Sequence, residues 1–201
     1  MNEKIIINAR IVDPSQKLDE MGSVIIDKNG KVKAIGKKIT KKDCPNAEVI
    51  DVKKNLIIPG IVDMKAFVGE PGFEYKENFR TLSQAALAGG VTSIVTMPNT
   101  KPIIDNVSMV DFIMRRGRDK SKINLFPCAS LTKQMEGKLM TEFGLLSAKG
   151  IIGFSDVNKT VQNTETMARI MDYASDIGVL IMQHAEAVSY THLTLPTNRE
   201  V

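Results

Sequence analysis

Tryptophan is absent from the sequence, and cysteine and histidine each occur only twice in 201 residues. Cys44 and Cys128 lack the Cys-x-x-Cys spacing of metal and redox motifs, so we expect reduced thiols and a cytoplasmic location. No apolar run reaches the roughly 18 residues that a membrane-spanning helix needs. The apolar run near Met1 is also too short for the core of a signal peptide. These absences argue against a disulfide scaffold, a membrane span and a secreted protein.

The sequence also lacks a strong excess of positive or negative charge, because the formal net charge is only +4. The pairs Lys37-Lys38 and Lys41-Lys42 have no interleaved aromatic residues, so we interpret them as solvated surface rather than a nucleic-acid site. Hydrophobic residues make up 43% of the chain, which is enough for a sizeable core. We therefore expect a globular protein without nucleic-acid or membrane partners.

Residues 1–55 alternate short β-like runs with turns, and they predict a small β unit without catalytic groups. The turn Asp27–Gly30 has the composition of a hairpin connection. The strands expected in this unit are residues 4–9, 23–26, 32–35 and 48–52.

From residue 56 onward, short apolar runs alternate with amphipathic helical patterns, which predicts a parallel α/β sheet. The expected strands are residues 61–67, 91–97, 123–129, 150–154 and 179–183. The expected helices are residues 78–88, residues 108–118 beginning with a Ser108 cap, and residues 164–177 ending at Gly178. An open nucleotide-binding sheet carries a glycine-rich first turn after its strand, whereas Gly89-Gly90 precedes a strand, so a barrel is favoured. A closed eight-stranded barrel takes about 250 residues, so we expect only part of one.

The first strand of the expected barrel raises the question of function. Residues 59–72 read PGIVDMKAFVGEPG, an apolar run that ends in a loop. Alternate residues of a strand share one face, so this strand tip presents Lys65 and Phe67 together. A metallohydrolase would carry a His-x-His pair at such a tip. The segment therefore has the frame of a metal site without the ligands.

Five motifs in collinear order resemble the long-chain dihydroorotases of the amidohydrolase superfamily. They are PGIVDM, EPGFEYKENF, AALAGGVTSIVTMPNTKPIID, GFSD and QHAE. The resemblance implies an α/β fold, a truncated TIM-like (β/α) barrel of the amidohydrolase type preceded by part of a small β-sandwich. It assigns residues 1–55 to the sandwich and residues 56–187 to the first half of the barrel. It also implies zinc-dependent hydrolysis of the cyclic amide dihydroorotate in pyrimidine biosynthesis.

At the first two expected strands of the barrel, only some of the residues that the resemblance implies for the site are present. In active members the first strand ends in Asp-x-His-x-His-x-Arg, where both histidines bind zinc and the arginine binds the substrate carboxylate. Asp63 matches, but Lys65, Phe67 and Gly69 occupy the other three positions. Asn99 in MPNT matches the asparagine that binds the same carboxylate. Two simpler readings remain open, in which Asn99 caps the following turn and Asp63 bonds only to backbone.

Later positions of the zinc site are also altered. Active members carry paired aspartates at the fourth strand tip, one of them a metal bridge. This chain has Asp156-Val157, and the spacing indicates that the bridging member is lost. His184 matches a zinc-binding histidine, although a single histidine at a strand tip is more commonly a hydrogen-bonded scaffold residue. The family's other histidine and its catalytic aspartate lie beyond this sequence, and Lys65 with Glu70 is a candidate ion pair where the metal would sit.

These replacements decide the expected chemistry, because zinc catalysis needs about three protein ligands plus a water. Phe67 has no lone pair, and protonated Lys65 repels a cation. His184, together with Asp156 at best, supplies too few zinc ligands, so we expect no bound zinc. The chain then resembles the non-catalytic dihydroorotase-like companions of aspartate transcarbamoylase, and we expect an oligomer at full length. The alternative is an active zinc-dependent dihydroorotase with an atypical site.

The last residues depart from the family pattern. Residues 188–197, VSYTHLTLPT, match the translation of the reverse complement of a common transposase-type sequencing adapter. We therefore interpret residues 188–201 as adapter-derived rather than native and exclude them from the fold. His184 is then the only native histidine of the chain.

Overall fold

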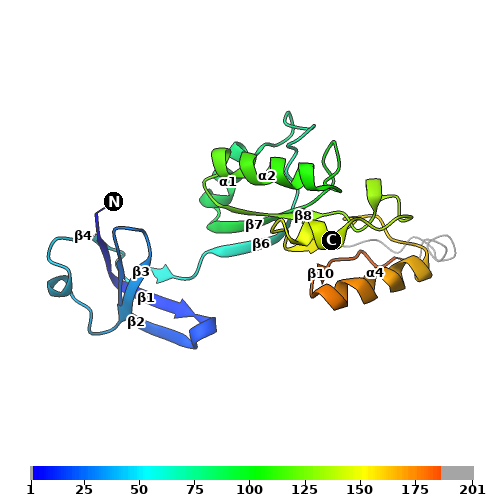
Figure 1. Ribbon diagram of the computed structural model, residues 1–201. Helices are drawn as coiled ribbons and strands as arrows, with labels where there is room; N and C mark the ends of the chain where they lie inside the picture. Colours follow the sequence, from blue (N-terminus) through cyan, green and yellow to red (C-terminus); the bar gives the residue numbers. More distant parts are fainter. Residues whose placement is uncertain (1, 187–201) are drawn as a thin grey trace, which may run out of the picture. The chain divides into compact units, whose positions relative to one another are not determined.

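A computed structural model describes residues 2–186 and divides the chain into two units, one up to Pro59 and one from Gly60. Each unit is described by itself (Figure 1). The tail that we interpret as adapter-derived, residues 188–201, lies outside the described residues.

The first unit is a five-stranded sheet in the order β3-β2-β1-β4, with β5 also paired to β1. Its strands are β1 (Lys4–Asp13), β2 (Leu18–Ile26), β3 (Val32–Gly36), β4 (Glu48–Asp51) and β5 (Leu56–Ile57). β1 and β2 pair antiparallel, whereas β4 and β5 run parallel to β1. The two faces of the sheet bury separate apolar clusters, one around Ile5 and Ile25 and one around Ile11 and Val24.

The boundary of this unit follows from β5. Sequence analysis begins the barrel at residue 56, but Leu56–Ile57 pairs with β1 through Arg10 and Ile11. The small unit therefore continues to Pro59. Val32 and Ile58 are about half exposed beside an apolar hollow of about 650 Å³. The apolar cluster around Ile11 and Val24 is thus only partly covered at this hollow within the described residues of this unit.

The second unit contains five parallel strands in the order β10-β9-β8-β7-β6. Their bounds are β6 (Ile61–Ala66), β7 (Val91–Thr96), β8 (Asn124–Ala129), β9 (Gly153–Phe154) and β10 (Leu180–Ile181). The helices between them are α1 (Phe79–Ala88), α2 (Val107–Lys120), α3 (Phe143–Ser147) and α4 (Thr164–Ile177). Figure 1 shows α1 and α2 side by side along β7 and β8. The predicted parallel α/β half-barrel is confirmed.

Asparagine side chains start three of the helices. Asn78 accepts hydrogen bonds from the backbone N–H groups of the first turn of α1, and Asn163 does the same for α4. At α2 the cap is Asn106, not the predicted Ser108, so the helix begins one residue earlier than expected. α4 ends as predicted at Gly178, whose φ of 67° is a left-handed conformation that glycine adopts without strain.

The core lies between the strands and the helices that cover them. The buried residues of α1 and α2 recur every three or four positions, which is the spacing that places them on one helix face: Phe79, Ser83, Ala86, Val110, Ile113 and Gly117. α3 was not predicted because it is a single short turn. It is anchored by Phe143, whose ring stacks on Phe154 at 3.8 Å between centroids.

The edge strand β6 shows that the barrel is open in the described part of the chain. Ile61, Val62 and Met64 are each about half exposed. A closed barrel has no edge strand, because further strands and helices cover such residues. The exposed apolar edge is therefore what a half-barrel requires.

Candidate functional site

The carboxyl ends of the five parallel strands meet at one edge, which is where barrel enzymes place their active sites. A hollow of about 230 Å³ at this edge is lined by Lys65, Val157 and His184, together with Met97, Ser155, Met182 and Gln183. We call it the mouth pocket. The structure thus brings together three of the positions selected from the sequence, from β6 and the loops after β9 and β10.

The side chain of Lys65 lines the mouth pocket and makes one weak polar contact among the described residues. Its Nζ is 3.4 Å from Oδ1 of Asn158, and the residue is exposed. The backbone N–H of Lys65 donates to Oδ1 of Asp63 at 2.9 Å. Asp63 therefore bonds to the local backbone, which is the simpler of the two roles considered for it from the sequence. An ammonium at this position cannot coordinate a metal while it is protonated.

Val157, where the resemblance predicts an aspartate, has a strained backbone. Its φ is 58°, a left-handed conformation that β-branched residues rarely adopt but that aspartate and asparagine tolerate. Its side chain is buried in an apolar cluster with Val95, Met97, Cys128 and Met135. A left-handed backbone therefore carries a buried apolar side chain at the position where the resemblance predicts an aspartate.

Asp156 is buried, and both of its carboxylate oxygens are bonded to Thr132. It is 1% exposed, and its carboxylate accepts hydrogen bonds from the backbone N–H of Thr132 at 3.1 Å and from the Thr132 hydroxyl at 2.5 Å. Burial raises the pKa of this carboxyl, and the two bonds from Thr132 act in the opposite direction. Since both oxygens bond to Thr132, Asp156 holds the loop after β8 and is not a free ligand.

Gly69 is required by the path of the loop after β6. A Cβ atom at Gly69 would lie 2.3 Å from the carbonyl oxygen of Phe73 and 2.6 Å from that of Glu77. The neighbouring Phe67 has an exposed fraction of 38%, and its ring lies 6.3 Å from the Phe73 ring. The arginine that the resemblance predicts at position 69 therefore does not fit this loop as it is folded here.

Glu70 anchors the same loop and was not recognised as an anchor from the sequence. Its buried carboxylate accepts from Nε of Arg116 on α2 at 2.5 Å and from the backbone N–H of Phe79 on α1 at 3.1 Å. The carboxylate of Glu70 raises the pKa of the Arg116 guanidinium. The candidate ion pair between Lys65 and Glu70 is therefore wrong. No sequence signal connects Glu70 to Arg116, because they lie 46 residues apart.

Asn99 lies beside a second hollow, of about 300 Å³, which we call the loop pocket. Its Oδ1 atom is buried and has no hydrogen-bond partner among the described residues. This oxygen therefore does not cap the following turn. In that turn the hydroxyl of Thr100 donates instead to the carbonyl of Pro102 at 2.6 Å.

His184 is 44% exposed at the rim of the mouth pocket. Its Nε2 lies 3.1 Å from Oε2 of Glu186, and its carbonyl oxygen accepts from the hydroxyl of Thr160 at 2.8 Å. These contacts match the scaffold reading of a single histidine. The carboxylate next to His184 is thus that of Glu186, which lies two residues along the chain.

The residues at the mouth pocket do not fit a zinc ion. Within residues 2–186, no group of three or more His, Cys, Asp or Glu side chains is placed to hold a metal. Zinc in proteins takes four ligands, of which a catalytic site supplies three from side chains. The described positions supply His184, a bonded Asp156, a lysine and a valine. The described residues at this edge therefore supply too few ligands for a zinc site.

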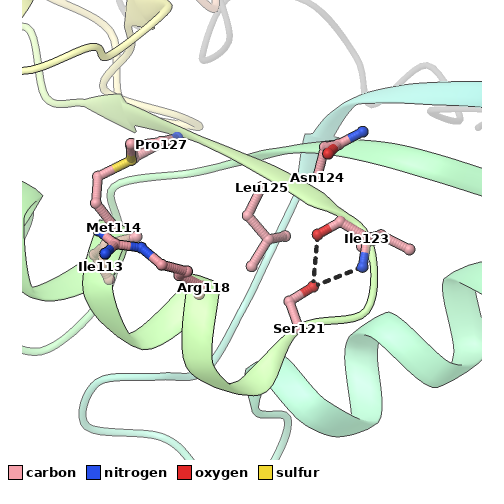
Figure 2. A pocket seen from close by; sticks show the side chains of 9 residues that line it. Ile113, Met114, Arg118, Ser121, Ile123, Asn124, Leu125 and Pro127 are labelled. Atoms are coloured by element: carbon pink, nitrogen blue, oxygen red, sulfur yellow. Dashed lines mark hydrogen bonds between the residues drawn. The ribbon is translucent and has the colours of Figure 1, made fainter. Parts of the chain in front are cut away.

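Another hollow, of about 250 Å³, lies between α2 and β8 (Figure 2). It is bordered by Met114, Arg118 and Leu125, and Ser121 at its rim bonds to the backbone of Ile123 at 2.9 and 3.1 Å. This hollow extends to the amino end of β8, opposite the strand ends where barrel enzymes act. We therefore do not assign it to the functional site.

No helix in the described part of the chain is long and apolar enough to cross a membrane. Both cysteines, Cys44 and Cys128, are free and buried. Burial raises the pKa of the Cys128 thiol, which makes it unreactive at neutral pH.

Comparison with known proteins identifies relatives over most of the chain. The dihydro-orotase-like family profile matches residues 54–194. A dihydroorotase of Trichlorobacter lovleyi is 39% identical over 182 residues, which cover 90% of this chain and 42% of that protein. A dihydroorotase of Aquifex aeolicus is 36% identical over 186 residues, covering 92% of this chain and 43% of that protein. The chain thus spans less than half the length of these curated relatives.

Solved structures agree on the fold. An L-hydantoinase (dihydropyrimidinase) from Arthrobacter aurescens superposes with a TM-score of 0.79 at 19% identity, covering 96% of this chain and 43% of that one. A crystal structure of a dihydroorotase superposes with a TM-score of 0.62 at 13% identity, covering 92% and 52%. At such identities the likeness shows the fold alone, and it confirms the amidohydrolase-type half-barrel.

Proposed function

Since the chain belongs to the dihydroorotase-like family, we propose that it is part of a non-catalytic member of that family. In this proposal the protein serves de novo pyrimidine biosynthesis in the cytoplasm as a structural partner of aspartate transcarbamoylase. The observation that carries the proposal is Val157, an apolar side chain packed into a cluster at the position of a metal-bridging aspartate. Lys65 and Phe67, at the positions of two zinc-binding histidines, support the same reading.

The physical reason for inactivity is the missing nucleophile. Zinc lowers the pKa of its bound water to about 7, which supplies hydroxide to attack an amide carbonyl at neutral pH. Without the metal, neither that hydroxide nor the charge that stabilises the developing oxyanion is available. The replaced positions lie at strand ends and in loops, so the layers that hold the barrel together remain intact.

The partner role rests on the resemblance to dihydroorotase-like chains with degraded metal sites. A barrel without its metal keeps its surface, and a stable surface can hold a transcarbamoylase subunit in an oligomeric assembly. We further propose that the full-length protein is itself oligomeric, as such companions are.

The experiment is to purify the full-length protein and mix it with the aspartate transcarbamoylase of the same organism on a sizing column. The proposal expects co-elution and no hydrolysis of dihydroorotate above a buffer control. An active dihydroorotase measured in parallel provides the positive control. Separate elution of the two proteins refutes the partner role, and turnover by the purified protein refutes the non-catalytic reading.

The second candidate is an active zinc-dependent dihydroorotase that hydrolyses dihydroorotate to N-carbamoyl-aspartate with an atypical metal site. The observation that favours it is His184, which keeps its family position at the rim of the mouth pocket. This candidate predicts that the full-length protein binds zinc and that His184→Ala abolishes both zinc binding and turnover.

A further inference from the structure

The hollow between α2 and β8 lies where the following crossover is too short to cover both elements. α2 and α4 each have 14 residues, whereas α3 has five. Lys149, just after α3, pairs through its Nζ with Oδ2 of Asp111 at 3.3 Å, so this crossover meets α2 in the first half of the helix. The hollow of about 250 Å³ lies beyond that contact, along the second half of α2 (Figure 2).

The hollow is internal to the half-barrel. β7 pairs with β8 from Asn124 to Pro127, whereas β9 pairs only with Cys128 and Ala129. The N–H of Ile152 donates to the carbonyl of Pro127 at 3.2 Å, so the chain returns to the sheet past the amino half of β8. The open edges of the described sheet are β6 and β10. Strands added there to close the barrel extend the sheet away from the hollow.

The inner wall of the hollow is apolar and fixed. Ile113 is buried, Leu125 is partly buried, and Met114 is 37% exposed. A Cβ atom at Gly117 would lie 3.0 Å from Cδ1 of Leu125, so α2 already packs closely on β8 beside the hollow. A volume of about 250 Å³ is below the usual range of small-molecule sites, about 300–1,000 Å³. The hollow therefore suits one inserted aliphatic side chain better than a whole small ligand.

The rim of the hollow is basic. Residues 115–122 read RRGRDKSK, with five basic residues and one acidic residue. Arg116 is already used, because it pairs with the buried carboxylate of Glu70. Three others are exposed and form no ion pair with another described residue: Arg118, Lys120 and Lys122. Figure 2 shows Arg118 on α2 bordering the same space as Leu125 on β8.

The dipole of α2 explains only part of this charge. Arg118 and Lys120 lie in the last turn, where cations stabilise the carboxyl end of a helix. The dipole does not explain Lys122, which lies beyond the helix, or the apolar wall next to these cations. A role confined to the helix predicts that changing Arg118 lowers stability alone, whereas a docking role predicts that it lowers affinity for a partner.

We propose that this surface docks an acidic segment of a partner protein, which inserts one aliphatic side chain into the hollow. Carboxylates on either side of that aliphatic residue pair with Arg118 and Lys122. The positive rim selects an acidic partner and speeds its approach, and the inserted side chain supplies most of the affinity. This goes beyond the proposed function, because the surface lies at the amino end of β8, away from the mouth pocket, and requires no particular partner.

The test is fluorescence anisotropy of labelled peptides with the full-length protein at low salt. The probe is the pentapeptide Asp-Glu-Leu-Glu-Asp. One control peptide has serine in place of leucine, and a second has lysine in place of every acidic residue. We expect the serine peptide to bind about tenfold more weakly, because it loses the buried aliphatic side chain, and the lysine peptide not to bind.

Variants locate the binding on this surface. Arg118→Gln and Lys122→Gln should each weaken the leucine peptide about threefold to fivefold, whereas Lys38→Gln, at an exposed lysine of the first unit, should not. Met114→Gln keeps the side-chain length and should weaken the leucine peptide severalfold but leave the serine peptide unchanged. Urea unfolding of each variant separates affinity from stability. Because Lys122 lies outside the helix, its variant stays informative if Arg118→Gln lowers stability.

Four results overturn the proposal. They are no binding at millimolar peptide, equal affinity for the leucine and serine peptides, unchanged affinity in both rim variants, and tighter binding of inorganic polyphosphate than of the leucine peptide. An effect of Met114→Gln on both peptides alike overturns insertion into the hollow. None of these measurements uses a transcarbamoylase, so failure of the proposed partner role and failure of this docking surface are distinguished.

Discussion

Replacing Val157 by alanine and by glycine tests whether the backbone at this position is strained, as expected if an aspartate once stood there. Val157 has a φ of 58° and is 8% exposed. Truncation to alanine removes two buried methyl groups and costs about 1–3 kcal/mol of unfolding free energy. The next step, from alanine to glycine, removes the Cβ that makes the left-handed region unfavourable by about 1–2 kcal/mol.

The matched control is Val161, which is 6% exposed and is not among the residues with positive φ. There the step from alanine to glycine only increases the entropy lost on folding, so it costs about 0.5–1 kcal/mol. At Val157 the same entropy loss is opposed by the relief of backbone strain. The alanine-to-glycine step there should therefore raise the unfolding free energy by about 0.5–1 kcal/mol. The sign of the alanine-to-glycine step should therefore invert between the two positions.

Urea unfolding of the four variants in the full-length protein measures the alanine-to-glycine step at both positions. The comparison holds if the unfolding free energy falls with urea concentration at the same slope in all four variants. The expected difference between the two alanine-to-glycine steps is about 1–2 kcal/mol. If glycine is less stable than alanine at position 157 by as much as at position 161, the backbone there is not strained. The argument that Val157 inherited an aspartate conformation would then be refuted.

Three further predictions concern the residues that hold the site loops. Gly69→Ala places a Cβ 2.3 Å from the Phe73 carbonyl and should cost about 1–3 kcal/mol in urea unfolding, whereas an unchanged midpoint contradicts the close approach. Arg116→Leu leaves the buried carboxylate of Glu70 without its charged partner and should lower the urea midpoint, whereas Arg116→Lys should lower the midpoint less; equal decreases in both variants contradict the ion pair. The raised pKa of Asp156 means that the folded state binds its proton more tightly, so unfolding free energy should fall as pH rises through about 3.9 toward the raised value. Asp156→Asn should remove that fall, and an identical pH profile in the variant contradicts the assignment.

The architecture was largely predictable because its signals are local. Apolar runs with intervening amphipathic patterns indicate parallel strands and helices, and Thr164–Ile177 followed by Gly178 is predicted to the residue. Ser108 failed as a cap because Asn106, two positions earlier, offers an equally good acceptor and starts the helix first. Leu56–Ile57 was assigned to the wrong unit because an apolar run does not reveal its pairing partner.

The candidate site was predictable only in part. The positions of Lys65, Val157 and His184 could be placed at one strand edge, because parallel strands align their carboxyl ends. The strained φ of Val157, the bond of Glu70 to Arg116 and the close approach at Gly69 depend on the three-dimensional path of loops. None of these leaves a periodic or compositional signal, so they required the structure.

The central claim is that this family member has lost its catalytic metal site. The measurement that tests it most directly is the zinc content of the purified full-length protein, taken together with its rate of dihydroorotate hydrolysis. The triple variant Lys65→His, Phe67→His, Val157→Asp, which restores three ligand types, serves as the comparison. The account predicts no stoichiometric zinc and no turnover in the unaltered protein, and a gain of zinc in the triple variant. Stoichiometric zinc in the unaltered protein, with turnover abolished by His184→Ala, would contradict it.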